Sequence, residues 1–329
     1  MNKHKIGTLV CLLAISFFCE TLVRSSHCNG QDSEPKNVIE KAKLQNAKFE
    51  KLSEMIQDDE LENAIKSLDQ ISEQNEVEFN QLIIQVYRLL IAQGFVARGS
   101  HEKSIAQVEK AFSYYLKNPN QMACRESLGS VLPAYQDTYL KADQIERYME
   151  LTKQAITQLK SYEDEHKLNK ATQHIFSLVR ARSAMADHVS PDVRDQIEAD
   201  LNAIISRLRK MTSTSPSNSD YAVALSRMLN TASMLHKASN QSVTYTKESF
   251  EQLEHAIESG AKDRTLAMEY HLSAIRLYFK LPTNSKERKK MALGVVKRLK
   301  QFDESIDGDL QRQIKYWEEI LNSKRTIEP

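Results

Sequence analysis

Hydrophobic residues recur every three or four positions through most of the chain. Between residues 191 and 211 the spacings are 4, 4, 3, 4 and 3. The positions that give these spacings are Val193, Ile197, Leu201, Ile204, Leu208 and Met211. They match the 3.6 residues per turn of an α-helix and not the alternation of a β-strand. No segment fits a strand better than a helix, so the sequence predicts an all-α protein without a β-sheet.

Short polar and turn-forming breaks divide this pattern into twelve or thirteen helices. Ser190 before Pro191 is a typical helix start, and Gly260 suits a helix end. Pro133 falls inside a helical run, where it should kink the helix or begin a new one. Every second expected start lies near residue 58, 101, 142, 191, 246 or 285. Helix pairs of roughly 40 residues indicate stacked hairpins, so the sequence predicts a right-handed α-solenoid of about six antiparallel pairs.

One pair carries a more specific pattern. Residues 88–120 read RLLIAQGFVARGSHEKSIAQVEKAFSYYLKNPN. This segment resembles a tetratricopeptide repeat, in which a large–small pair, an aromatic and a small closing residue mark the first helix, and small residues mark the second. The matching positions are Ile91, Ala92, Phe95, Gly99, Ser104, Val108 and Ala111. Arg88 departs from the family pattern, which has a bulky aromatic there, and Pro119 comes about three residues late. Weaker echoes occur at 60–68 and 249–257. The resemblance implies a protein- or peptide-binding scaffold with a concave groove, and no chemistry.

The N-terminal thirty residues are typical of an export signal. Lys3 and Lys5 precede an apolar run from Ile6 to Cys19, and a polar stretch follows Glu20. The run is shorter than the roughly 20 apolar residues that a membrane span needs. We therefore expect a signal peptide at 1–30, cleaved after Ser25 or Gly30, and a periplasmic or secreted protein. An uncleaved N-terminal anchor is the alternative.

The remaining chain is expected to hold two helical regions. A polar linker at 31–36 precedes an N-terminal helical-repeat region at 37–211. The segment TSTSPSNS at 212–219 is low in complexity and is the predicted boundary. A C-terminal helical-repeat region follows at 220–329. It ends in an amphipathic helix around Trp317 that suits a terminal cap, with Trp317 itself expected in the core.

Composition narrows the classes of function. Only 8 glycines and 7 prolines occur in 329 residues, which disfavours turn-rich β folds and a glycine-rich phosphate loop. Lys and Arg number 45 against 44 Asp and Glu, so the chain lacks the basic excess of a nucleic-acid binder. Removing residues 1–30, which hold three of the cations and one of the anions, leaves 42 against 43. Cleavage after Ser25 would retain Cys28 as a possible partner for Cys124. Otherwise Cys124 is expected to be a small buried residue.

No residue set in the sequence defines a catalytic, cofactor or metal site. Glu163 and His166 form one Glu-x-x-His pair, but the second pair that a di-iron bundle needs does not occur. We expect an exported, non-enzymatic scaffold that binds a protein or peptide, without nucleic acid or a cofactor. The alternative is an enzyme on a helical toroid or bundle, of the carbohydrate-active hydrolase or lyase type. Such an enzyme would use paired carboxylates, for which Asp137 and Asp187 are undistinguished candidates.

Overall fold

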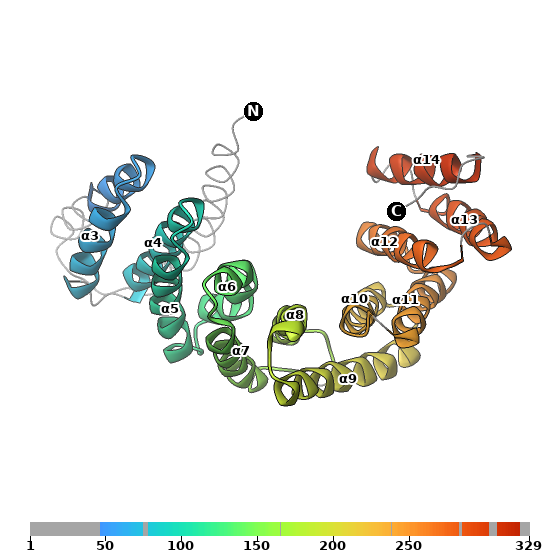
Figure 1. The fold of residues 1–329 in the computed structure, drawn as a ribbon, viewed down its shortest axis with the longest axis horizontal. Helices are drawn as coiled ribbons and strands as arrows, with labels where there is room; N and C mark the ends of the chain where they lie inside the picture. Colours follow the sequence, from blue (N-terminus) through green and yellow to red (C-terminus); the bar gives the residue numbers. More distant parts are fainter. Residues whose placement is uncertain are drawn as a thin grey trace, which may run out of the picture. The chain divides into compact units, whose positions relative to one another are not determined.

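The computed structural model describes residues 47–322, except 75–77, 165, 238, 283–284 and 303–307. In these residues the chain is helical and contains no strand (Figure 1). Residues 47–57 are helical. The other helices are α3 (Leu61–Gln74), α4 (Glu78–Ala97), α5 (His101–Lys117), α6 (Met122–Lys141), α7 (Ile145–Lys160), α8 (Lys170–Ala184), the short 3₁₀ helix η1 (Ala186–His188), α9 (Pro191–Thr214), α10 (Ser219–Leu235), α11 (Asn240–Glu258), α12 (Arg264–Lys280), α13 (Lys286–Leu299) and α14 (Gly308–Asn322). The all-α prediction is confirmed, whereas the signal peptide, the 31–36 linker and Cys28 lie outside the described residues.

Helix ends follow from local side chains. Pro191 occupies the first turn of α9 directly after Ser190, as predicted. The side chain of Asn169 accepts a hydrogen bond from the backbone N–H of Thr172 and so caps α8. At the turn after α11, Gly260 has a φ of +97°, a conformation that glycine adopts without a steric penalty. The predicted helix starts near 191 and 285 lie within one residue of the observed ones, whereas the start predicted near 246 lies six residues after the beginning of α11.

The chain divides into two units, residues 1–114 and 115–329. In the first unit, α3, α4 and the preceding helical residues share a core. The repeat-like positions of α4 and α5 face inward, since Ile91, Ala92, Ser104, Val108 and Ala111 are fully buried.

Arg88 explains one departure from the repeat pattern in the first unit. Its guanidinium is buried, and it pairs with Asp69 at 2.8 Å and donates to Gln107 Oε1 at 3.2 Å. Arg88 therefore stands where the repeat pattern has an aromatic side chain, and Asp69 on α3 compensates its charge. A buried charge is tolerated only when it is paired and hydrogen-bonded in this way.

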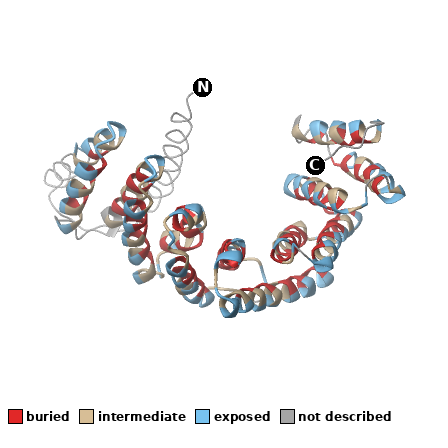
Figure 2. Cartoon of the chain, in the orientation of Figure 1, coloured by how far each residue is buried: buried red, intermediate tan, exposed pale blue. Residues whose placement is uncertain are grey.

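The second unit stacks helices in two layers. Helices α6, α8, α10 and α12 pack against one another in sequence, and we call them the inner layer. Helices α7, α9, α11 and α13 each pack against inner-layer neighbours, and Figure 1 shows them on the outside of the curve; we call them the outer layer. Buried residues lie between the two layers, as Figure 2 shows. This arrangement confirms the predicted stack of antiparallel helix pairs.

The 212–219 segment does not separate two units in the structure. Helix α9 continues to Thr214 and α10 begins at Ser219, so only four residues connect them. The two helices pack closely across this loop. Low complexity identified the loop, but three of its Ser and Thr residues (Thr212, Ser213 and Thr214) donate to carbonyls of the preceding turn and extend α9. Pro133, similarly, neither ends nor starts a helix, since α6 runs through it.

The C-terminal helix completes a large core. Trp317 on α14 is fully buried and lies in one cluster with residues of α10 to α13. Its Nε1 donates to His271 Nδ1 at 3.0 Å. The expectation of a core tryptophan is confirmed. Among the described residues, no helix has the length and apolar content to cross a membrane.

Candidate functional site

A pocket of about 290 Å³ opens on the inner layer between α6, α8 and α10. Helical spacing builds it: residues three, four or seven apart on α8 share one face, and small side chains there leave room. Met234 at its edge is 68% exposed, which is unusual for a methionine. The lining residues are Pro133, Gln136, Ser177, Arg180, Ala181, Ser183, Ala184, Thr231 and Met234.

Arg180 is the charged group of this pocket. Among the described residues no carboxylate pairs with it. Partial burial lowers the pKa of Arg180, and the nearby guanidinium groups of Arg227 and Arg276 lower it further, while the charge of Glu269 partly opposes them. Arginine nevertheless stays protonated near neutral pH. The positive charge at Arg180 is therefore held at an energetic cost that a bound anion would offset.

The arginines come from three successive inner-layer helices. Arg227 on α10 donates from Nε to Glu269 Oε2 at 3.0 Å, and Arg276 on α12 lies 3.6 Å from the same carboxylate. Glu269 is almost fully buried, with 6% of its side chain exposed. Two guanidinium groups thus share one carboxylate, and Arg180 adds a third cation, which leaves two positive charges in excess. We call Arg180, Arg227 and Arg276 the arginine cluster.

Neutral hydrogen-bonding groups stand beside the arginine cluster. The side chains of Gln136 and Ser177 make no hydrogen bond to another described residue. Thr231 donates to the carbonyl of Arg227 at 2.8 Å and retains its acceptor capacity. A guanidinium fork matches the planar geometry of a carboxylate or the oxygens of a phosphate. The pocket is suited to hold an anionic group by binding and orientation, and none of its lining residues is a carboxylate or a histidine.

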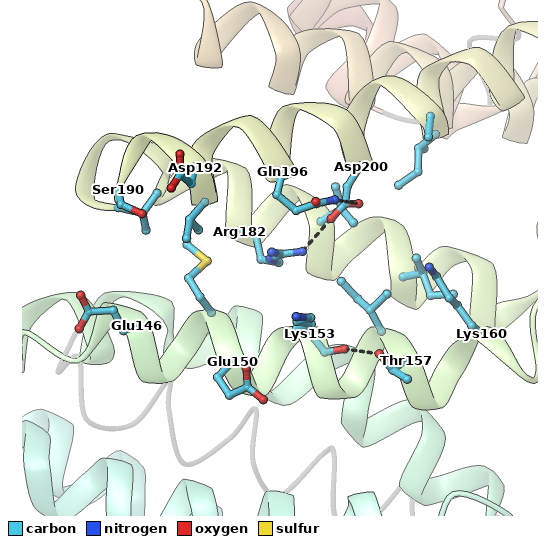
Figure 3. A pocket seen from close by; sticks show the side chains of 18 of the residues that line it. Glu146, Glu150, Lys153, Thr157, Lys160, Arg182, Ser190, Asp192, Gln196 and Asp200 are labelled. Carbon is cyan, nitrogen blue, oxygen red and sulfur yellow. Dashed lines mark hydrogen bonds and ion pairs between the residues drawn. The ribbon is translucent and has the colours of Figure 1, made fainter.

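A larger recess lies in the outer layer. This groove has a volume of about 760 Å³. Its walls are formed by α7 and α9, with α8 behind them (Figure 3). The resemblance of residues 88–120 implied a concave groove, which would lie on the inner layer. This recess lies on the outer layer instead. Sequence reasoning did not find it, because no residue pattern encodes the separation of two helices that both pack against a third. The same limit applies to the arginine cluster, whose members are 47 and 49 residues apart.

The residues singled out from the sequence are scattered. Glu163 accepts a close ion-pair hydrogen bond from Arg207, and His166 is exposed. Asp187 accepts from Lys237 Nζ at 2.6 Å, which with Arg194 keeps the pKa of that carboxyl low, and Asp137 is exposed on α6. Neither aspartate lines the pocket or the groove.

Cys124 is buried in α6, as expected. Within the described residues, no group of three or more His, Cys, Asp or Glu side chains is arranged to hold a metal ion.

Comparison with known proteins gives one structural likeness. No protein-family model matches the sequence. No curated protein matches it at a significant level. A solved structure described as the TPR2AB-domain:pHSP90-complex of yeast Sti1 matches over 86% of this chain and 100% of that chain, with 10% identity and a TM-score of 0.27. The architecture itself consists of antiparallel helix pairs that stack on their neighbours.

The chain is an all-α helical repeat protein. The predicted stack of helix pairs is confirmed, and the likeness of residues 88–120 to a tetratricopeptide repeat stays a resemblance of sequence. In such a helical repeat protein each pair buries its apolar face against the next pair, and the exposed faces of both layers are left for binding.

Proposed function

We propose that this helical repeat protein is an exported, non-enzymatic scaffold that binds an acidic segment of another protein on the inner layer of its second unit. The arginine cluster carries this proposal. Arg180 has no carboxylate partner among the described residues, and one buried glutamate serves the two other guanidinium groups. A glutamate or aspartate of the partner would supply the missing charge, while Gln136 and Ser177 hold neighbouring polar groups.

Binding is tested with two fluorescein-labelled ten-residue peptides, one with four glutamates and one with glutamine at the same positions. We expect saturable binding of the acidic peptide and weakening with added salt. Arg180→Glu should weaken binding about 10–100-fold, because a hydrogen bond to a charged group contributes about 1.5–3 kcal/mol. Arg180→Lys should lose less, since it keeps the charge but not the fork. Fluorescence anisotropy measures each affinity.

Arg312→Glu is the matched control for Arg180→Glu. Arg312 lies on α14, its side chain is 79% exposed, and it is remote in sequence from the pocket. Arg312→Glu introduces the same change of charge as Arg180→Glu and should leave the affinity for the acidic peptide within twofold. Equal affinity for the acidic and the glutamine peptide, or equal loss in both arginine variants, would contradict the proposal.

Export is supported by the sequence of residues 1–30. If the full chain is expressed in a cell with a secretory pathway, we expect the mature protein outside the cytoplasm, beginning at Ser26 or at Gln31. Mass spectrometry of the intact protein from each fraction identifies the first residue. A chain that stays in the cytoplasm and retains residues 6–19 would argue against export. A control with Leu12→Arg and Leu13→Arg, which interrupts the apolar run, should remain inside the cell.

A further inference from the structure

The groove of the outer layer is as long as an extended peptide of about seven residues. Its lining residues run from Glu146 to Lys160 along α7 and from Asp192 to Arg207 along α9. At about 1.5 Å per residue, each wall is about 22 Å long. An extended segment of seven residues, at about 3.3 Å per residue, spans about 23 Å, which matches the length of these walls.

The base of the groove is apolar. Met149 and Ile156 of α7 and Ile175 and Val179 of α8 line it, and each is largely buried. Ile204 of α9 adds a half-buried side chain. An extended segment places every second side chain on one face, so aliphatic residues at alternate positions would cover this strip.

The ends of the groove differ in charge. Glu146, Glu150 and Asp192 stand at one end, and no cation pairs with them among the described residues. Lys153 stands near the middle and Lys160 toward the opposite end, as Figure 3 shows, and neither has a carboxylate partner in the described part of the chain. The groove therefore favours a segment that is cationic at one end and anionic at the other.

Acidic residues in the first turn of a helix also offset the helix dipole, so these charges alone do not define a site. The second observation is Arg182 on α8, which lies midway along the groove between the two walls (Figure 3). Its side chain is 7% exposed, and its guanidinium pairs with Asp200 at 2.9 Å through one terminal nitrogen. Its Nε has no hydrogen-bond partner. A buried donor without a partner is costly, so the middle of the groove holds an unsatisfied polar group.

We propose that the α7–α9 groove binds an extended segment of about seven residues from a partner protein. The segment carries Lys or Arg over Glu146, Glu150 and Asp192, aliphatic residues at its centre, and a carboxylate over Lys160. This site is separate from the arginine cluster and does not depend on its function.

A labelled peptide of two arginines, three valines and two glutamates tests the groove, together with its reversed sequence. We expect one direction to bind saturably to the full chain by fluorescence anisotropy. Glu150→Lys should weaken binding at least tenfold, because Glu150 lies exposed on the wall and its replacement reverses the charge. A peptide with one glutamate in place of an arginine should lose less affinity in this variant than the original peptide does. The charge exchange distinguishes direct contact from a general loss of structure.

Two further variants complete the experiment. Glu251→Lys on α11 is the matched control, since Glu251 is exposed on the outer layer and away from the groove. It should leave affinity within twofold. Ala203→Trp on α9 should fill the groove and abolish binding while circular dichroism keeps its helical signal. The proposal is overturned if neither direction of the peptide saturates, or if Glu150→Lys and Glu251→Lys have the same effect.

Discussion

Gly129→Ala is expected to lower the free energy of unfolding of the second unit by about 2 kcal/mol. Gly129 lies on α6 where this helix meets α8, and an added Cβ would overlap Cβ and Cγ of His174. The position of the His174 Cβ is set by the backbone, so a change of rotamer cannot relieve its overlap, and α6 and α8 must separate. Overpacking of this kind costs about 1–3 kcal/mol, while alanine recovers part of that through its better helix propensity.

Gly294→Ala provides the opposite expectation within the same unit. Gly294 lies inside α13, and nothing stands within 4 Å of an added Cβ. Alanine should therefore stabilise this helix by about 0.5–1 kcal/mol. Urea unfolding of both variants, followed by circular dichroism, measures the two effects. If Gly129→Ala raises the midpoint as Gly294→Ala does, α6 and α8 do not approach each other as described.

Gly129 also shows where sequence reasoning ends. The periodicity of apolar residues predicts each helix and the face it buries, because that face is formed by residues of one continuous segment. It does not predict that α6 and α8 meet at a glycine and a histidine 45 residues apart. A close approach depends on the placement of two helices relative to each other. The hydrophobic pattern of one helix does not predict that placement.

The candidate sites were missed for the same reason. Arg180, Arg227 and Arg276 each look like one cation on an otherwise ordinary helix, and their common surface exists only after three pairs have stacked. Charge balance over the whole chain concealed the local excess, because 45 cations and 44 anions nearly cancel. Arg88 shows the converse: it stood out as a departure from the repeat pattern, and the structure supplies its partner, Asp69, from another helix.

Trp317→Ala is expected to have the largest effect on stability, about 3–5 kcal/mol at the C-terminal end. The indole is fully buried, and its ring lies 5.7 Å from that of Tyr278 and 6.2 Å from that of His271. Because repeat arrays unfold partly from their ends, we expect α14 to separate before α7 to α9. Hydrogen exchange should therefore accelerate first in α14. Uniform acceleration in all helices of the second unit would contradict a local capping role.

Trp317→Phe separates the hydrogen bond from the packing. Burial lowers the pKa of His271, and its Nδ1 accepts from the indole N–H, so the folded protein favours neutral histidine. The unfolded chain then binds more protons below about pH 6.5, and stability falls as pH decreases from 7.5 to 5.5, by at most about 1.4 kcal/mol per pH unit for one group. Phenylalanine retains a ring but not the donor. The urea midpoint of Trp317→Phe should be lower at pH 7.5 and depend less on pH, whereas an unchanged pH dependence would mean that this hydrogen bond does not hold His271 neutral.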